Sequence, residues 1–377
     1  MHLVDTTMFY APEGGGVQRY LTAKHHWLRK HTSVRHTILA PGGVNSCADN
    51  GIITLKSSSL LLTNGYRFPL RLAPWRKRLM KLTPDLIEVG DSFGPAWAAL
   101  DAGQKMGIPV AGFYHSDVIR LVGTRFGATV EKAAARYVRH LYKNFDLVIA
   151  PSCYVAEKLQ AIGVESVIRQ PLGVDAELFH PKRSDPQLRR KLGLREDTRL
   201  LIFAGRFAPE KNIPVLLSAF RRLGKRYHLL LVGGGMHLNV PSNVTVYGYQ
   251  RSERELARLI ASCDALVHAG RQETFGLVVL EAMASALPVI GVAEGGVAEL
   301  VGKRSGILVS SVSGNAFAEG IETLYNYGPE LLGRRAREKV EKSYSWNQVM
   351  RSLLALYQER LLFSWGANIS NDAYAYR

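Results

Sequence analysis

The sequence has little of several features that mark particular classes of protein. Its 377 residues contain only three cysteines, Cys47, Cys153 and Cys263, scattered without the spacing of metal ligands. We therefore expect neither a disulfide framework nor a zinc site, and we interpret the cysteines as reduced, mostly buried thiols.

Long apolar runs are also missing. No run approaches the roughly 20 residues that a membrane-spanning helix needs. The first residues lack the basic stretch and apolar run of a secretory signal. We expect a cytoplasmic protein, either free or peripheral at the inner face of the plasma membrane. The length and the 47% hydrophobic fraction predict two globular domains.

Acidic residues are scarce, and the formal net charge is +16. Between Lys56 and Lys81 there is no acid at all, and the cations alternate with apolar residues such as Leu72 and Trp75. A basic amphipathic stretch can lie on an anionic membrane, each cation contributing about 1 kcal/mol. We favour this partner for residues 56–81 over a solvated surface loop. Nucleic acid is not expected, since no recognisable nucleic-acid-binding module accompanies the charge.

Short apolar runs alternate with helical patterns along the chain, which is typical of parallel sheets covered by helices. The predicted strands are 3–9, 37–40, 51–55, 86–89, 110–113, 147–150, 167–170, 200–204, 229–232, 244–247, 265–268, 289–292 and 307–309. The predicted helices of the first half are 17–30, 95–105, 128–143 and 155–162.

The alternation is interrupted by prolines and a glycine at 171–181, the best candidate for a linker. We therefore predict an N-terminal Rossmann-like acceptor domain over 1–172 and a C-terminal Rossmann-like donor domain over 173–345. Apolar residues at helical spacing predict a helix over 346–363 that packs back on the first domain. The polar residues 364–377 are expected to form a frayed tail.

Glycine-rich loops follow two of the predicted strands. Gly14, Gly15 and Gly16 precede a helix, where backbone N–H groups can approach a pyrophosphate. Arg19 stands where a dinucleotide fingerprint needs its third glycine, and no acid ends the second strand. A dehydrogenase is therefore disfavoured.

The second such loop, 205–212, contains Arg206 and Lys211 directly after the strand 200–204. Ligands of open parallel sheets bind beyond the carboxyl ends of strands, so both cations are placed to hold phosphates. A pair of surface cations is the alternative. It is less favoured because the next loops, 233–235 and 268–276, are also rich in glycine.

Two carboxylates eight residues apart, Glu273 and Glu281, flank Gly276. We expect a helix to begin near Gly276, so that Glu273 precedes its N-terminus and Glu281 lies in its second turn. A helix N-terminus favours an anion such as phosphate, which suggests a nucleotide-sugar site. Both acids as salt-bridge partners in the core remain an alternative.

Arg206 with Lys211, and Glu273 spaced from Glu281, resemble the paired signatures of the retaining glycosyltransferases of family 4. The resemblance covers almost the whole chain and includes Gly248 before a helical segment and the Gly295-Gly296 loop. It implies the GT-B fold, an α/β architecture of two Rossmann-like domains whose parallel sheets face each other across a cleft.

The resemblance also implies roles for individual residues. Arg206 and Lys211 would bind the donor diphosphate, Glu281 the ribose and Glu273 the hydroxyls of the transferred sugar. The remaining donor-binding residues would be Gly15, Gly16, Thr274, Phe275, Gly276 and Leu277, the last three through their backbone.

The chemistry requires a nucleoside diphosphate to leave an anomeric carbon, so charge builds on phosphate oxygens. Metal-dependent transferases usually meet this need with an Asp-x-Asp, which this sequence lacks. Arg206 and Lys211 can replace the metal, and we predict metal-independent catalysis without cofactors. His115, at the end of a strand, is the predicted contact to the donor sugar, with a structural histidine as the alternative. Asp117 is a weaker candidate for orienting or deprotonating the acceptor.

Donor and acceptor are the least determined parts of this prediction. Mannose from GDP-mannose is slightly preferred over glucose from a UDP-sugar. The resemblance implies a lipid-linked or saccharide acceptor, in cell-envelope glycolipid or exopolysaccharide synthesis. A GT-B epimerase or phosphorylase-like enzyme and a catalytically silent nucleotide-sugar-binding protein remain as alternatives.

Overall fold

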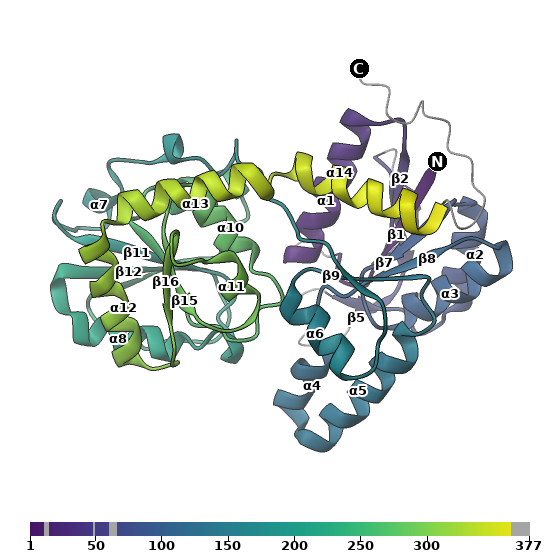
Figure 1. Cartoon of the computed structure of the whole chain (residues 1–377), viewed down its shortest axis with the longest axis horizontal. Coiled ribbons are helices and arrows are strands. Elements are labelled where there is room, and N and C mark those ends of the chain that lie inside the picture. The colour runs from purple at the N-terminus through teal and green to yellow at the C-terminus, as the bar shows by residue number, and fades with distance from the viewer. Residues whose placement is uncertain (11–14, 48–49, 60–65, 363–377) are drawn as a thin grey trace. The chain divides into compact units, whose positions relative to one another are not determined.

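The computed structural model describes residues 1–10, 15–47, 50–59 and 66–362 (Figure 1). The chain divides into two compact units. The N-terminal unit comprises Met1–Pro171 and the C-terminal segment from Trp346, and the C-terminal unit comprises Leu172–Ser345. These divisions lie one residue before the predicted boundary at 172/173 and at the predicted boundary 345/346. The predicted tail lies outside the described residues.

In the described part of the N-terminal unit, the main sheet has the strand order β10-β9-β8-β7-β1-β2-β4-β3. All its pairs are parallel except β3 with β4. A separate two-stranded sheet joins β5 to β6. The strands are β1 His2–Thr6, β2 Arg35–Gly42, β3 Ser46–Cys47, β4 Ile52–Lys56, β5 Ser58–Ser59, β6 Arg67–Phe68, β7 Leu86–Val89, β8 Val110–Phe113, β9 Leu147–Ala150 and β10 Val167–Arg169.

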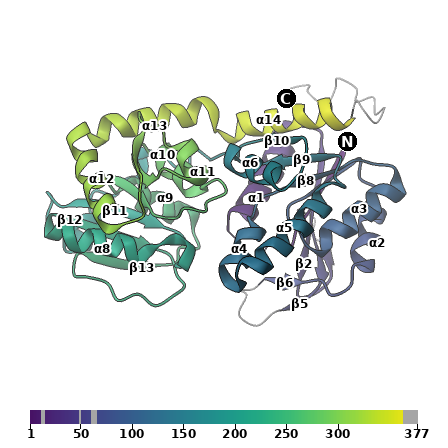
Figure 2. The ribbon, with the colours of Figure 1, turned by 60° about the horizontal axis from the view of Figure 1, so that its bottom comes forward.

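Helices cover both faces of this sheet (Figure 2). They are α1 Gly16–His31, α2 Ala73–Leu82, α3 Gly94–Met106, α4 Val118–Phe126, α5 Ala128–Tyr142, α6 Cys153–Ala161 and α14 Trp346–Tyr357, which continues as a π-helix over Gln358–Leu362. α14 buries Val349, Leu353 and Tyr357 and contacts α1. Its packing in the N-terminal unit agrees with the apolar periodicity of the sequence.

α2 was not among the predicted helices, and it changes the interpretation of the basic stretch 56–81. Trp75, Leu79 and Leu82 are spaced to share one helix face, and all three are buried. The predicted amphipathic character is therefore partly that of a core helix. Residues 60–65 of the stretch lie outside the described residues.

The C-terminal unit has a wholly parallel sheet of six described strands in the order β13-β12-β11-β14-β15-β16. The order reverses between β11 and β14, and such a switch point is where open α/β sheets bind ligands. The strands are β11 Arg199–Ala204, β12 Tyr227–Val232, β13 Val244–Gly248, β14 Ala265–His268, β15 Val289–Val292 and β16 Gly306–Val309.

The helices of this unit form two layers. α8 packs on α12, whereas α10 packs on α9 and α13 (Figure 1). The helices are α7 Leu188–Lys191, α8 Ile213–Leu223, α9 Glu253–Ala261, α10 Leu277–Ala284, α11 Gly295–Leu300, α12 Gly314–Tyr327 and α13 Pro329–Ser343, with short 3₁₀ turns at Pro181–Arg183, Pro209–Lys211 and Gly224–Arg226. The two units are thus Rossmann-like α/β domains, as predicted.

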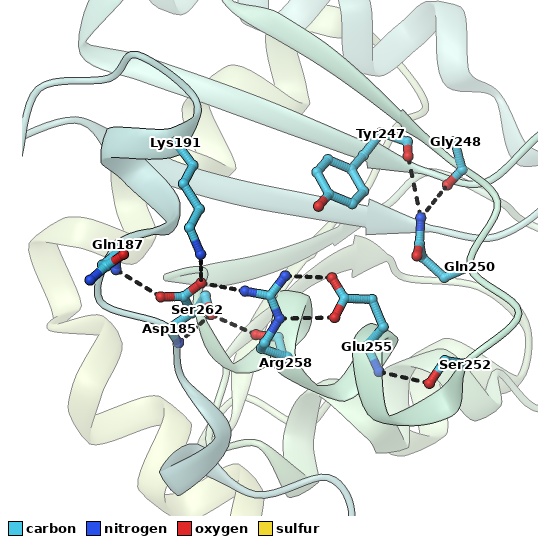
Figure 3. A network of polar contacts seen from close by, with 10 residues as sticks. All are labelled: Asp185, Gln187, Lys191, Tyr247, Gly248, Gln250, Ser252, Glu255, Arg258 and Ser262. Atoms are coloured by element: carbon cyan, nitrogen blue, oxygen red, sulfur yellow. Dashed lines mark hydrogen bonds and ion pairs between the residues drawn. The ribbon is translucent and has the colours of Figure 1, made fainter.

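A polar network fastens the start of this unit to α9 (Figure 3). Asp185 accepts from Lys191 Nζ at 2.8 Å and from Arg258 Nη1, and its backbone N–H donates to Ser262 Oγ at 2.8 Å. Arg258 also forms a forked contact with Glu255, with Nε 2.9 Å from Oε2. The network therefore holds the segment after Pro181–Arg183 against the sheet's helical layer.

Two expectations from composition can be compared directly with the fold. Cys47 and Cys153 are exposed and only Cys263 is buried, so the prediction of mostly buried thiols was wrong. Among the described residues, no helix is both long enough and apolar enough to cross a membrane.

Candidate active site

The carboxyl edge of the parallel sheet in the C-terminal unit collects the predicted donor-binding loops. Residues 205–212 follow β11, 233–235 follow β12, 249–252 follow β13, 269–276 follow β14 and 293–294 follow β15. Neighbouring loops are joined by backbone hydrogen bonds, with Phe207 N donating to Gly234 O at 2.7 Å and Gly233 N to Gly248 O at 2.9 Å. The edge is therefore a continuous backbone surface.

Glycines allow this close approach. A Cβ added at Gly233 would lie 1.9 Å from Gly205 O, and one at Gly235 would lie 2.4 Å from Phe207 O. Both glycines also have positive φ, at 151° and 137°. No other residue fits at positions 233 and 235 without moving the 205–212 loop, which contains Arg206 and Lys211.

Lys211, Glu273 and His268 form the charged centre of the site. Lys211 Nζ forms an ion pair with Glu273 Oε1, and His268 Nε2 lies 3.2 Å from the same oxygen. Lys211 and Glu273 are each 18% exposed. Burial raises the pKa of Glu273, but Lys211 and the hydrogen bond with His268 outweigh burial and hold this pKa far below its usual value. Glu273 is therefore an anion at all physiological pH values.

The sequence-based prediction did not include His268 or Asn212. His268 ends β14, five residues before Glu273, and that position was the available signal. Asn212 Nδ2 donates to Ala269 O at 2.9 Å, which ties the loop after β11 to the loop after β14. Asn212 also has φ of 50°, a left-handed conformation that asparagine tolerates. Together these residues set the positions of Lys211 and Glu273.

A second loop supports the backbone at Glu273. Gly296 N donates to Glu273 O at 2.9 Å, and Arg271 forms a forked ion pair with Glu294, with contacts of 2.6 and 2.8 Å. A Cβ at Gly296 would lie 2.7 Å from both Phe275 Cα and Thr274 O. The loop 271–276 is thus pressed against the start of α11.

We expect Gly296→Ala to raise the KM for the donor by about tenfold, because its methyl group must displace the backbone of Thr274 and Phe275. The matched control is Gly302→Ala, where an added Cβ meets nothing within 4 Å. Steady-state kinetics of both variants would check this. Equal KM values for Gly296→Ala and the wild type would contradict the proposed support of the Glu273 loop.

The helix prediction at Gly276 is confirmed. α10 begins at Leu277, with Gly276 as its N-cap at φ of 96°. Phe275 is 2% exposed, so its ring belongs to the core and only its backbone borders the site. Glu281 lies in the second turn of α10 and is 3% exposed. Val279 N already donates to Gly276 O at 3.0 Å, so only the N–H groups before Val279 lack an intrahelical acceptor, as is usual at a helix start.

Arg206 lies apart from this charged centre. Its side chain is 66% exposed and its Nη2 lies 3.6 Å from Glu210 Oε1. Lys211 and Glu273 are thus already assembled, whereas Arg206 is held only by a weak surface pair. Neither its predicted phosphate contact nor the predicted ribose contact of Glu281 is tested by these positions, and both stay predictions.

The predicted residues of the N-terminal unit lie at two strand ends. Gly15 and Gly16 open α1, with Gly15 as its N-cap, whereas Gly14 lies outside the described residues. His115 follows β8, and its ring stacks on that of Phe113 with the ring centres 4.0 Å apart, whereas the tilted ring of Tyr20 lies 4.8 Å away. Burial lowers the pKa of His115 to about 3, and Lys24 adds to this effect. His115 is therefore a neutral imidazole, able to hydrogen-bond a sugar hydroxyl without carrying charge.

Asp117 is committed to structural contacts. Its Oδ1 accepts from Arg120 N at 3.1 Å as the N-cap of α4, and its Oδ2 forms an ion pair with Lys158. Its side chain is 8% exposed. The role of Asp117 toward the acceptor stays a prediction, and the structure gives this carboxylate a second function as the anchor of α4.

Two family models match this chain. The model for Glycosyltransferase Family 4 matches residues 14–178, and the model for Glycosyl transferases group 1 matches residues 184–342. The chain belongs to the family 4 glycosyltransferases. Membership makes this transferase a nucleotide-sugar-dependent enzyme, and the edge around Lys211 and Glu273 lies within the group 1 match.

Two curated relatives of the transferase come from Mycobacterium tuberculosis. A GDP-mannose-dependent alpha-mannosyltransferase is 33% identical over 248 residues, which are 64% of this chain and 65% of the relative. A GDP-mannose-dependent alpha-(1-6)-phosphatidylinositol dimannoside mannosyltransferase is 26% identical over 378 residues, covering 94% of this chain and 95% of the relative. The match to the first spans slightly less than two thirds of that relative's length.

Solved structures share the fold of this transferase. Sucrose-phosphate synthase from Thermosynechococcus elongatus has a TM-score of 0.80 at 21% identity, covering 97% of this chain and 99% of its own. HepE from Anabaena, in complex with UDP-glucose, has a TM-score of 0.76 at 18% identity. The match covers 95% of this chain and 100% of the HepE chain. These likenesses support the GT-B fold class.

Proposed function

We propose that this transferase moves mannose from GDP-mannose to a lipid-linked or saccharide acceptor with retention of configuration and without a metal ion. The observation that carries the proposal is the assembled Lys211–Glu273–His268 cluster at the switch point of the donor sheet. The preference for GDP-mannose rests on the two relatives from Mycobacterium tuberculosis. A phosphatidylinositol mannoside in the second relative's name supports a lipid-linked acceptor.

The cluster suits a hydroxyl-binding and phosphate-binding site at once. Lys211 and His268 both hydrogen-bond to Glu273 Oε1. Neither contact uses Oε2, which can accept a hydrogen bond from a sugar hydroxyl. Lys211 has three donors and needs one for Glu273, so the others can face a phosphate. Arg206 would join it when a diphosphate is present. Lys211 and Arg206 at the leaving phosphate would then supply the charge that a metal ion supplies in other transferases.

Retention fits a site without a covalent nucleophile. The ion pair that Lys211 forms with Glu273 and the hydrogen bond with His268 lower the nucleophilicity of this carboxylate. We propose that departure and attack occur on the same face of the sugar, with the leaving phosphate accepting the acceptor's proton. Mass-spectrometric trapping of a glycosyl group on Glu273 would contradict this mechanism.

We expect GDP to raise the melting temperature more than UDP, because a ligand that binds only the folded state stabilises it in proportion to its affinity. A thermal-shift panel of GDP, UDP, ADP and their mannose and glucose conjugates would measure this. Product analysis with the preferred donor, with and without EDTA, then tests transfer and metal dependence. A larger shift with UDP would show that the donor is a UDP-sugar and not GDP-mannose. Isomerisation of the donor without an acceptor would favour an epimerase.

A further inference from the structure

The α4–α5 hairpin of the N-terminal unit exposes several apolar side chains. Leu121 on α4 and Phe126 at its end are 60% and 62% exposed, and Val130 at the start of α5 is 39% exposed. The two helices pack on each other and are joined only by Gly127, which has φ of 87° (Figure 1). The turn of the hairpin therefore presents a small apolar tip.

The hairpin is also rich in cations along its length. Residues 118–143 contain six lysines and arginines and a single carboxylate, Glu131, which lies 3.5 Å from Arg120 Nη1. Lys132, Arg136 and Lys143 are exposed, and their spacing places them along one face of α5. None of these three forms an ion pair with another described residue. The hairpin thus combines an apolar tip with an uncompensated basic face.

The hairpin is rigidly mounted. Asp117 caps α4 and binds Lys158 on α6. Tyr137 OH on α5 donates to Ser92 O at 2.7 Å and accepts from Trp97 Nε1 at 3.1 Å. α4 and α5 approach closely, since a Cβ at Gly123 would lie 2.6 Å from Glu131 Oε2. The exposed side chains therefore need little ordering before they meet a partner.

We propose that the α4–α5 hairpin docks on the surface of an anionic phospholipid bilayer. Leu121 and Phe126 would enter the boundary between headgroups and acyl chains, while Lys132, Arg136 and Lys143 approach the phosphates. Exposed leucine and phenylalanine side chains near the turn, followed by exposed cations along α5, match the two layers of a bilayer surface. A nucleic acid would match the cations but leave Leu121 in water.

The bilayer partner was expected at residues 56–81, and the structure adds a different surface. Trp75 and Leu79 of that stretch are buried, but Leu70, Leu72 and Met80 are exposed, so the hairpin is a second exposed apolar and basic surface in addition to that stretch. The inference deepens the proposed function, because α4 begins directly after Asp117 at the carboxyl end of β8. Docking would hold the N-terminal unit at the surface in which a lipid-linked acceptor lies. Lipid binding itself requires no donor and no transfer.

Co-sedimentation with vesicles tests the proposal on the full chain. The vesicles are phosphatidylcholine alone and phosphatidylcholine mixed with phosphatidylglycerol, at low and physiological salt. We expect binding to the mixed vesicles only. Lys132→Gln/Arg136→Gln/Lys143→Gln should lower the partition coefficient between vesicles and water about 100-fold. Each cation contributes a factor of about five, and the three factors multiply. Leu121→Ser/Phe126→Ser should lower it at least tenfold, about the effect of re-exposing one large apolar side chain.

Matched controls remove the same chemistry elsewhere. Arg221→Gln/Arg222→Gln/Lys225→Gln removes three exposed cations from the C-terminal unit, and Tyr327→Ser removes an apolar side chain that is 67% exposed. A further variant, Arg71→Gln/Lys77→Gln/Lys81→Gln, tests the stretch 56–81. The proposal is overturned if the wild type binds no anionic vesicle or if both hairpin variants retain binding. It is also overturned if the C-terminal triple variant loses as much vesicle binding as the hairpin triple variant. Binding lost only with the 71/77/81 variant would overturn it in favour of that stretch.

A fluorescence probe separates insertion from adhesion. Phe126→Trp should shift its emission to the blue on mixed vesicles and be quenched by brominated acyl chains, whereas Tyr327→Trp should show neither change. An unchanged Phe126→Trp spectrum overturns insertion of the tip. The GDP thermal shift of each variant should equal that of the wild type. If all proteins lack that shift but bind vesicles as expected, the proposed function fails and the docking surface stands.

Discussion

Lys211→Ala is expected to lower kcat by about three orders of magnitude while the protein stays folded, the size seen when one preorganised stabiliser of transition-state charge is removed. Two effects combine at this position. The substitution removes a cation from the leaving diphosphate, and it also removes the ion-pair partner of Glu273. The pKa of Glu273 then rises toward its usual value, since only His268 still opposes burial.

Arg206→Ala is expected to lower kcat by about two orders of magnitude, because it also removes a cation from the leaving diphosphate. It should leave Glu273 undisturbed. Arg206 is exposed and has only a 3.6 Å surface pair with Glu210, so its removal should leave the melting temperature of the free protein unchanged. The control is Lys225→Ala, an exposed lysine of the same unit with no ion pair to a described residue. Its kinetics should equal those of the wild type.

A double-mutant cycle separates the two effects at Lys211. If Lys211 acts partly by holding Glu273, the losses of Lys211→Ala and Glu273→Gln will be less than additive, because they share one interaction. Lys211→Ala and Arg206→Ala should be closer to additive, since the structure joins these residues by no contact. Near-normal turnover of both alanine variants would remove the diphosphate-binding assignment altogether.

The parallel sheets were predictable because their strands are buried on both faces. β12 and β15 are buried throughout, and residues 229–232 of β12 and all of β15 are apolar runs soon followed by glycines. The same property locates the site, since in a parallel sheet all carboxyl ends share one edge. Lys211 and Glu273 could therefore be placed at one edge of the sheet from the sequence, whereas their direct contact depends on β11 and β14 being neighbours in the sheet.

Side-chain contacts between distant segments were not predictable in this way. His268 looked like the end of an apolar strand, and only the fold turns its ring toward Glu273. α2 shows a different limit, because a helix that packs on a core and one that lies on a membrane have the same apolar periodicity. Trp75 is buried and Leu121 is exposed, and no local pattern separates them.

The buried cation Lys24 was missed for the same reason. It lies on α1, and its Nζ is 2.9 Å from Oδ1 of Asp5 on β1 and 3.0 Å from Oε2 of Glu88 on the neighbouring strand β7. All three side chains are 1% exposed. Tyr20 donates to Glu88 at 3.0 Å, and His36 Nε2 lies 2.8 Å from Asp5. One lysine therefore offsets two carboxylates in the core of the N-terminal unit.

Lys24→Met is expected to lower the free energy of unfolding by about 3–5 kcal/mol, because it leaves buried carboxylates without their cation. The control is Lys30→Met on the same helix, where the side chain is exposed and the expected change is within about 0.5 kcal/mol. Urea unfolding followed by circular dichroism measures both. A Lys24→Met variant as stable as the Lys30→Met control at pH 8 would show that the carboxylates do not need this cation.

The stability that Lys24→Met loses should increase as the pH rises. Burial raises the pKa of Glu88 from 4.5 to about 7 even though Lys24 opposes the rise, and removing Lys24 must raise this pKa further. Above pH 4.5 the unfolded chain releases this proton while the folded variant retains it, so the folded variant loses stability as the pH rises toward its own pKa. The difference from the wild type should therefore be small near pH 5 and largest near pH 8. Glu88→Gln in the Lys24→Met background should restore part of the stability at pH 8, since the amide carries no charge and still accepts from Tyr20.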